Sequence, residues 1–399
     1  MLRRTFITLA LLCGGVATFF AVWIVVPAPS YSLWLVAVGA SEWSLWLGAL
    51  GFAGACFSLL ARVAGARRGT TCLAISLGVV SILLSLIPPL TALREARAQN
   101  LQLSLGRYLF GTKTGPTSDR ASQTFTFANA DSRALNLDAY LPTAKQATLN
   151  PAVIVVHGGS WSAGARSHFP RWNWWLVEQG YAVFDIDYRL APQPNWQTAT
   201  GDVKCAVGWV RANAQRLNVD PQRIALFGRS AGAHLALLAA YSDNEPQLSQ
   251  SCPAADARVQ AVVSFYGVTD LAWAYAHPAN QRVIDGPETL RRFTGGTPED
   301  ATEIYRMASP TAHVNERTPP TLLFHGGQDQ LVRSENMELL ARQLEAARVP
   351  FDALRLPYAQ HGFDYNFDGW GSQLAQPLIL AFLRAHLVSP TKSSAETKQ

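Results

Sequence analysis

The chain of 399 residues is long enough for one large α/β domain and a further region of its own. Hydrophobic residues make up 49% of it and charged residues only 15%, and the apolar excess lies in the first hundred residues. The net charge of +5 lies there too, and the remainder, with 26 basic and 26 acidic residues, gives no sign of nucleic-acid binding.

The first apolar run, residues 6–26, follows Arg3 and Arg4 and is long enough to cross a bilayer, which takes roughly 20 residues. A cleaved signal peptide would have a shorter apolar core and a cleavage site of small residues after it. More apolar sequence follows instead. We therefore predict an uncleaved membrane helix.

A second apolar run, residues 33–61, is too long for one straight crossing and contains Glu42. Because a carboxylate at mid-bilayer costs about 3 kcal/mol, we predict a helix that begins near Trp43 and leaves residues 33–40 at the interface. A third span is expected over residues 72–86, extending towards Leu93. Five aromatic residues are placed to form a belt on one side of the membrane: Trp23, Tyr31, Trp34, Trp43 and Trp46.

Basic residues in the short loops predict the orientation of these spans. They precede the first span (Arg3 and Arg4) and lie between the second and third (Arg62, Arg67 and Arg68), with none between the first and second. The positive-inside rule then places the N-terminus in the cytoplasm and, after three crossings, the rest of the chain outside. Arg94 and Arg97 oppose this assignment mildly, and an even number of spans would reverse it. We expect an integral protein of the plasma (inner) membrane with an extracytoplasmic domain.

Residues 101–122 are polar and are expected to form a linker. From Thr124 the hydrophobic period changes to two, and residues 124–127 and 135–141, joined through 129–132, predict a β-hairpin. Strand-like and helix-like runs alternate after it. Further strands are predicted at 151–156, 181–186, 223–227, 259–265, 321–324 and 351–356, with helices at 198–217, from Ala231 to Leu238, at 334–347 and at 374–387.

This alternation predicts an α/β domain over residues 123–388, with a mostly parallel sheet covered by helices on both faces and the hairpin at its edge. The stretch from Thr269 to His313 breaks the rhythm and is a candidate lid or insertion over a site. Residues 389–399 form a short polar tail that we expect to be disordered. No internal repeat is present.

The five cysteines fall into two groups. Cys13, Cys56 and Cys72 lie in apolar runs, where a thiol behaves as a small hydrophobic group. Cys205 and Cys252 lie in the polar part, and the sequence leaves open whether they pair in an oxidising compartment. No spacing of cysteine or histidine predicts a metal site.

Ser230 is the candidate nucleophile. It lies in Gly228-Arg229-Ser230-Ala231-Gly232, where a β-type run meets a helical run. So sharp a turn forces the serine into a strained backbone geometry that leaves room only for small residues two positions on either side, and Gly228 and Gly232 provide it. The serine then stands at the head of a helix, where backbone N–H groups favour developing negative charge.

A second glycine-rich loop, His157-Gly158-Gly159-Ser160-Trp161, follows the strand that ends at Val156. Successive glycines let backbone N–H groups point into a pocket, as an oxyanion-binding loop requires. A plain tight turn is the alternative interpretation.

A serine nucleophile needs a base that is itself oriented by a carboxylate. His361 lies just after the last strand, and Asp329 follows the strand at 321–324, so both are expected at the edge of the sheet where Ser230 stands. Asp364 and Asp368 are rival carboxylates, but both follow His361 and would have to fold back.

The remaining histidines have weaker context: His325 and His234 are expected to be packed structural residues, and His168, His277, His313 and His386 have no supporting context.

These motifs, with Asp187-Tyr188-Arg189-Leu190-Ala191-Pro192 and His361-Gly362-Phe363, give the chain a clear resemblance to a known family. It resembles the α/β-hydrolases of the hormone-sensitive lipase and carboxylesterase group, and most of all bacterial feruloyl/acetyl-xylan esterase-like (BD-FAE-like) domains. The resemblance covers residues 123–388. The chain departs from the lipase motif H-G-G-G at its third glycine, which is Ser160 here, and this argues against the classical lipase branch.

The resemblance implies that Ser230 is the nucleophile, His361 the general base and then acid, and Asp329 the residue that orients His361. It also implies that backbone N–H groups of Gly159 or Ser160, together with Ala231, hold the oxyanion. Asp187, Tyr188 and Arg189 are expected to brace the site structurally. His157, Gly158, Gly228 and Gly232 support the two loops.

The hypothesis is a membrane-anchored serine esterase that works through an acyl-enzyme and needs no metal or organic cofactor. The family resemblance alone implies that its substrates are short acyl esters of small alcohols or sugars. A serine peptidase of the same fold is the first alternative, although such peptidases usually carry a large gating domain. The others are a non-catalytic binding protein on an esterase fold and a membrane sensor or transporter, for which the single Glu42 is weak support. The partners expected are a small ester and the lipid bilayer, not nucleic acid, and the sequence does not indicate an oligomeric state.

Overall fold

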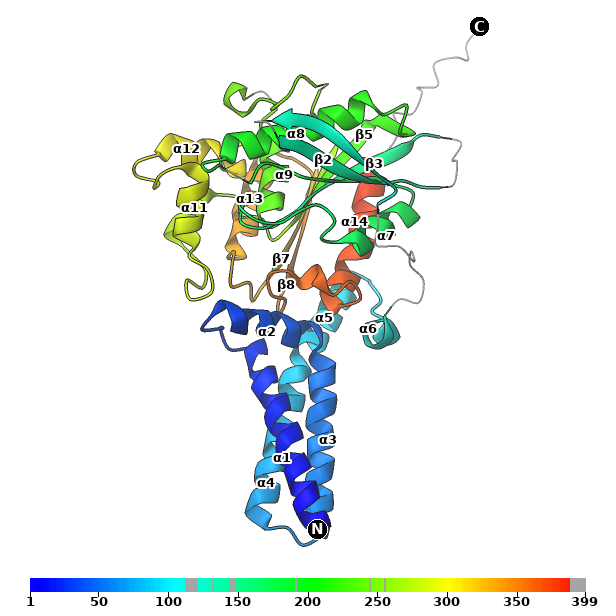
Figure 1. Cartoon of the computed structure of the whole chain (residues 1–399), viewed down its shortest axis with the longest axis vertical. Coiled ribbons are helices and arrows are strands. Elements are labelled where there is room, and N and C mark those ends of the chain that lie inside the picture. Colours follow the sequence, from blue (N-terminus) through cyan, green and yellow to red (C-terminus); the bar gives the residue numbers. More distant parts are fainter. Residues whose placement is uncertain are drawn as a thin grey trace.

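The computed structural model describes residues 1–111, 121–130, 133–143, 148–190, 192–243, 245–254 and 256–387. The predicted tail and residues 112–120 of the predicted linker therefore lie outside the described residues. Figure 1 shows a long helical bundle at the N-terminal end, with the α/β domain above it and a short helix lying across the junction between them.

The bundle consists of α1 (Leu2–Ala21), α3 (Ser44–Val63) and α4 (Arg68–Ser85). Their contact surfaces are built of small residues: a Cβ on Gly54 would meet the backbone of Gly14 at 2.8 Å, and a Cβ on Gly78 would meet the carbonyl of Gly51 at 2.5 Å. Such close backbone approach is typical of helix packing in membranes. In the described part of the chain three helical runs, Leu2–Ile24, Ser44–Val63 and Arg68–Ala98, are long and apolar enough to cross a membrane.

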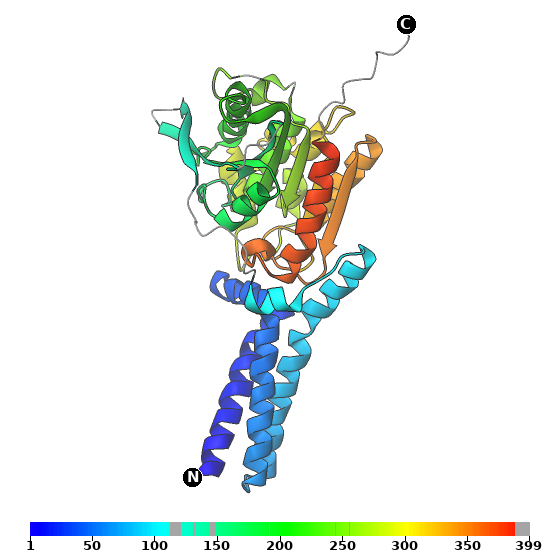
Figure 2. The ribbon, with the colours of Figure 1, turned by 90° about the vertical axis from the view of Figure 1, so that its right-hand side faces the viewer.

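Helix α2 (Tyr31–Glu42) lies across the upper end of this bundle, and α3 begins two residues after it ends (Figures 1 and 2). The predicted break beside Glu42 is therefore confirmed. The Glu42 side chain is buried at the junction with the α/β domain. Burial, and then the nearby Asp364 carboxylate, raise the pKa of Glu42 well above its ordinary value, which favours its neutral form.

The chain leaves the bundle through α5 (Ile87–Ala98), which follows α4 after Leu86, has Pro88 and Pro89 in its first turn, and lies beside the α/β domain (Figure 2). The stretch expected as a linker contains a short helix, α6 (Leu105–Phe110). Its Tyr108 ring stacks on Trp370 with centroids 4.2 Å apart. This part of the chain therefore packs on the domain.

Within the described residues, eight strands form one sheet in the order β1-β2-β4-β3-β5-β6-β7-β8. The strands are β1 (Gln123–Ala130), β2 (Arg133–Tyr140), β3 (Asn150–Val156), β4 (Ala182–Ile186), β5 (Val219–Arg229), β6 (Ala261–Phe265), β7 (Thr321–Gly326) and β8 (Phe351–Leu356). The β1–β2 hairpin and the β2–β4 pair are antiparallel, and all later pairs are parallel. The predicted class, a mostly parallel sheet with an antiparallel edge, is confirmed.

Helices cover both faces of the sheet because successive residues of its central strands point to opposite sides. In β3, Ala152, Ile154 and Val156 join one core cluster, and Val153 and Val155 join the other. The first cluster is covered by α8 (Trp196–Ala212), α9 (Ala231–Tyr241) and α13 (Glu335–Ala346). The second is covered by α7 (Pro170–Glu178) and α14 (Trp370–His386).

The segment that breaks the α/β rhythm folds into α10 (Leu271–Ala276), α11 (Gly286–Thr294), α12 (Thr302–Met307) and a short 3₁₀ turn, Pro310–His313. Side chains of Asp270 and Asp285 accept hydrogen bonds from N–H groups of the first turns of α10 and α11. We refer to residues 269–313 as the cap.

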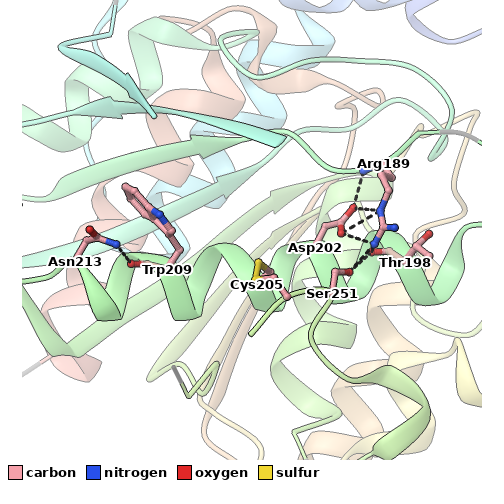
Figure 3. The surroundings of a disulfide bond; sticks show 8 residues. Arg189, Thr198, Asp202, Cys205, Trp209, Asn213 and Ser251 are labelled. Carbon is pink, nitrogen blue, oxygen red and sulfur yellow. Dashed lines mark hydrogen bonds and ion pairs between the residues drawn. A yellow bond between two sulfur atoms is a disulfide. The ribbon is translucent and has the colours of Figure 1, made fainter. Parts of the chain in front are cut away.

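Cys205 of α8 and Cys252 form a disulfide, so the pairing that the sequence left open is present (Figure 3). Beside it, the Arg189 guanidinium forms an ion pair with the buried Asp202 at 2.7 Å and donates to the Ser251 hydroxyl at 2.7 Å. The disulfide attaches the segment around Ser251 to α8 directly, and Arg189 connects Ser251 to Asp202 of the same helix.

Candidate active site

Ser230 stands in the turn between β5 and α9, as the glycine pattern predicts. Its φ is +54°, which is strained for a residue with a side chain. A Cβ on Gly228 would meet the Gly232 carbonyl oxygen at 2.3 Å, and one on Gly232 would meet the Val156 carbonyl oxygen at 2.2 Å. Only glycine fits at both positions, which is why the sequence permits so tight a turn here.

In the predicted triad, His361 lies within hydrogen-bond distance of both Ser230 and Asp329. His361 Nε2 is 2.9 Å from Ser230 Oγ, and His361 Nδ1 is 2.7 Å from Asp329 Oδ2. They come from turns after β5, β7 and β8, which end at the same edge of the sheet. Oδ1 of Asp329 accepts from the N–H groups of Leu331 at 2.8 Å and Val332 at 2.9 Å, which fixes the carboxylate in place.

The electrostatic environment keeps Asp329 ionised although it is buried. Burial by itself raises the pKa of Asp329, but His361 beside it and hydrogen bonds from His325 and His361 outweigh burial and hold that pKa well below its ordinary value. An ionised Asp329 favours the tautomer of His361 that carries its proton on Nδ1. The other ring nitrogen, Nε2, is then free to accept the proton of Ser230.

The rival residues have other partners. His325 lies in β7 and contacts the Val332 carbonyl at 2.9 Å and Asp329 Oδ2 at 3.2 Å, so it is the packed histidine that was expected. Asp368 pairs with Arg107 and Arg171, each at 2.6 Å. His313 and His386 have contacts of their own away from the triad. His277 lines the same cavity as Ser230, and its Nδ1 lies 2.9 Å from the Trp273 carbonyl.

The oxyanion-loop candidate lies directly beside the serine turn, because β3 and β5 are neighbours. A Cβ on Gly158 would meet the Arg229 carbonyl at 2.9 Å. Gly159, Ser160 and Trp161 all have positive φ, at 125°, 52° and 58°. Ser160 lines the same cavity as Ser230 and Ala231. Ala231 is the first residue of α9, where an N–H group has no partner within the helix.

Tyr188, one of the three residues expected to support the site structurally, contacts the oxyanion-loop candidate at His157. The Tyr188 hydroxyl donates to the His157 carbonyl at 3.1 Å, and the two rings stack with centroids 4.4 Å apart. Burial is the main reason why the pKa of His157 falls to about 4, so this histidine is neutral at physiological pH. Asp187 forms an ion pair with Arg166.

The cap closes the other side of a cavity of about 60 Å³. Its walls are mostly apolar and include Ala274, Ile284 and Leu290 from the cap. Trp161 connects the two halves: its ring stacks on Phe293 of α11 at 4.2 Å, and its Nε1 donates to Nδ1 of His234 at 3.1 Å. His234 is buried in α9 with Nε2 2.7 Å from the Ala308 carbonyl, as expected of a structural histidine, and burial lowers its pKa to about 4.

Sequence reasoning missed a buried ionic group behind the triad. Asp364, a rejected candidate for the carboxylate, accepts from Arg229 Nε at 2.5 Å and from the Tyr266 hydroxyl. The Tyr266 ring lies 4.3 Å from the ring of His361, and its φ of +44° is strained. The sequence did offer a signal for Tyr266. It directly follows β6, which ends at the edge of the sheet where the triad lies.

Comparisons with known proteins show that the sequence and the fold are similar to those of esterases. The sequence model of the BD-FAE family matches residues 137–344, a little over half of the chain. The chain is 36% identical to esterase LipC of Mycobacterium tuberculosis over 222 residues, which are 54% of this chain and 53% of LipC. It is 33% identical to the probable carboxylic ester hydrolase LipM of the same organism over 230 residues, 54% and 49% of the two chains. The chain thus spans about half the length of the curated relatives it matches.

Among solved structures, the chain is similar to a thermophilic esterase of Thermogutta terrifontis, Est2, with propionate bound. The TM-score is 0.56 at 25% sequence identity, and the similarity covers 69% of this chain and 98% of that one. The α/β-hydrolase fold implied by the sequence motifs is confirmed.

Proposed function

This chain belongs to the BD-FAE family, and on that premise we propose that it is a membrane-anchored serine hydrolase that cleaves carboxylic esters of short acyl groups. The observation that carries the proposal is the continuous line of hydrogen bonds from Asp329 through His361 to Ser230. We assign residues 1–100 to the membrane region and residues 123–388 to the catalytic domain.

In the proposed mechanism, His361 Nε2 takes the proton of Ser230 as its Oγ attacks the ester carbonyl. The negative charge that develops on the carbonyl oxygen is stabilised by the N–H groups of Gly159 or Ser160 and of Ala231. The alcohol leaves with a proton from His361, and a water molecule activated by the same imidazole then releases the acid. Asp329 stabilises the imidazolium at both steps.

The size of the cavity supports a short acyl group. A water molecule needs about 10–15 Å³ of such space, so 60 Å³ corresponds to a few waters, or an acyl chain of a few carbons. The propionate bound to the Thermogutta esterase is a ligand of this size.

The chain-length profile of hydrolysis tests this function. We expect the full chain in detergent to cleave p-nitrophenyl acetate, propionate and butyrate, with kcat/KM falling at least about tenfold by decanoate because the small cavity leaves no room for longer chains. Initial rates of p-nitrophenol release across the series measure this. Absence of hydrolysis with every ester contradicts the esterase assignment, and a rise towards decanoate contradicts the short-acyl specificity alone.

We further propose that the catalytic domain lies outside the cytoplasm, in the plasma membrane. The three candidate spans, the basic residues of the loop around Arg67 and the disulfide between Cys205 and Cys252 support this orientation. A phosphatase reporter that is active only in an oxidising compartment, fused after Leu101, is expected to be active. A cytoplasmic reporter that is active at the same position would contradict the orientation.

A further inference from the structure

The edge of the sheet that carries the triad faces the membrane region. In Figure 2 the strand β8, drawn as an orange arrow, points down towards the helical bundle, and β7 runs parallel to it. Asp329 and His361 follow these two strands, so the candidate active site lies at the end of the domain nearest to α2. Figure 1 shows the segment before α11 descending towards α2 from the cap.

Hydrogen bonds join the loop before α2 to the cap and to the loop after β7 that carries Asp329 and Gln330, which we call the acid loop. The Ala28 N–H donates to Gln330 Oε1 at 2.7 Å, and Asn280 Nδ2 of the cap donates to the Ala28 carbonyl at 2.6 Å and to the same Gln330 oxygen at 2.9 Å. Gln330 Nε2 in turn donates to Gln360 at 3.2 Å. Gln330 follows Asp329, and Gln360 precedes His361. We call this group, Ala28, Asn280, Gln330 and Gln360, the clasp.

An apolar cluster continues the clasp along α2. Ala28, Trp34 and Val38 of the membrane region pack with Val283 of the cap, and Leu331 lies against the same cluster. Leu331 also lines the cavity that contains Ser230. Two cap residues line it as well: Ala279, which precedes Asn280, and Ile284, which follows Val283. One side of the cavity wall is therefore backed directly by α2.

The distance from this wall to the bilayer is small. Because α2 lies across the end of the bundle, the wall stands about one helix diameter, roughly 10 Å, above the membrane-spanning helices. The headgroup layer on each side of a bilayer is about 5–8 Å thick. An ester carried in the headgroup layer thus lies close to the height of the cavity, whereas a dissolved ester gains nothing from an active site at this end of the domain.

We propose that the substrate is a short-chain acyl ester of a membrane-embedded amphiphile, which reaches Ser230 from the bilayer that holds α1, α3 and α4. This inference rests on the proposed esterase function and names its substrate class. The acyl group occupies the cavity, and the lipid part remains in the bilayer beside α2. The clasp holds the cap and the acid loop against α2, so that the cavity stays at the membrane surface.

The experiment places enzyme and substrate in the same or in separate vesicles. The full chain is reconstituted in phosphatidylcholine vesicles with a diacylglycerol whose third hydroxyl carries a butyryl group, and butyrate release is measured. We expect release at least tenfold faster when the probe shares the enzyme's vesicles than when it is in separate ones. Equal rates in the two arrangements, with p-nitrophenyl butyrate cleaved normally, would overturn the proposal. Failure to cleave p-nitrophenyl butyrate as well would instead contradict the esterase function.

A matched pair of variants tests the clasp. Asn280→Ala removes the hydrogen bonds to Ala28 and Gln330, and Gln281→Ala removes an exposed amide next to it. We expect Asn280→Ala to lower the rate on the shared-vesicle probe about fivefold or more while p-nitrophenyl butyrate is cleaved within twofold of the parent rate. Gln281→Ala should change neither. Equal shared-vesicle rates for the two variants would overturn the role of the clasp.

Discussion

Replacing Ser230 with alanine is expected to lower kcat for p-nitrophenyl butyrate by about 10⁴- to 10⁶-fold, to a level set by the remaining oxyanion loop and binding contacts. The reason is that Oγ is the atom 2.9 Å from His361 Nε2, and no acyl-enzyme forms without it. The measurement is p-nitrophenol release by the full chain at saturating ester. A burst of product in the parent chain that is absent from the variant would identify the lost step as acylation.

The fold should survive this substitution. Ser230 already has a Cβ at its strained φ, so alanine adds no steric conflict. A matched control is Ser162→Ala, which removes an exposed hydroxyl from the neighbouring loop and is expected to keep full activity. If Ser230→Ala keeps more than about a tenth of the parent activity, the nucleophile is another residue and the mechanism above is wrong.

Asp329→Asn is expected to lower kcat by about 10⁴-fold with little change in KM. Oδ2 of Asp329 faces His361 Nδ1 at 2.7 Å and His325 Nε2 at 3.2 Å. An amide with its NH₂ group at that position would hold Nδ1 as the acceptor and leave the proton on Nε2, which then cannot take the proton of Ser230. Because Asp329 contacts the histidines and is not among the residues lining the cavity, we expect the loss to fall on kcat.

Kinetics of this variant are compared with those of Asp352→Asn, which makes the same chemical change at an exposed position of β8 and is expected to be neutral. Full activity in Asp329→Asn would mean that a different carboxylate orients His361. The buried Asp364, which reaches His361 through the Tyr266 ring, would then be the first residue to test.

The positions of Ser230, Asp329 and His361 could be predicted because each follows a strand of the same parallel sheet, and the carboxyl ends of such strands meet at one edge. Sequence patterns predict strands and tight turns, and the ends of the strands determine where the residues that follow them lie. Asp364 was rejected as the triad carboxylate, and in the structure Asp329, not Asp364, contacts His361 Nδ1. The reason for the rejection was wrong, however, because the short turn after Gly362 does bring Asp364 back, onto Arg229, 135 positions earlier in the chain.

The junction with the membrane region could not be predicted for a related reason. The hydrogen bond between Ala28 and Gln330 joins residues 302 positions apart, and neither residue belongs to a motif. The apolar period of residues 33–40 indicated only that they avoid water, not whether lipid or protein covers them. In the structure Trp34 and Val38 are covered by the cap, whereas Leu35 is exposed.

The stacking of Tyr108 on Trp370, described above, belongs to a wider contact in which Ala92 and Ala96 of α5 join the core cluster under α14. Core packing therefore runs without interruption from the anchor into the catalytic half. A chimera that grafts this hydrolase onto a foreign anchor would leave an uncovered apolar seam along α14 unless residues 87–110 travelled with it. A catalytic domain designed for transfer to another anchor should therefore begin before α5, near Leu86. The polar stretch 101–122, which composition alone would suggest as the boundary, lies too late in the chain.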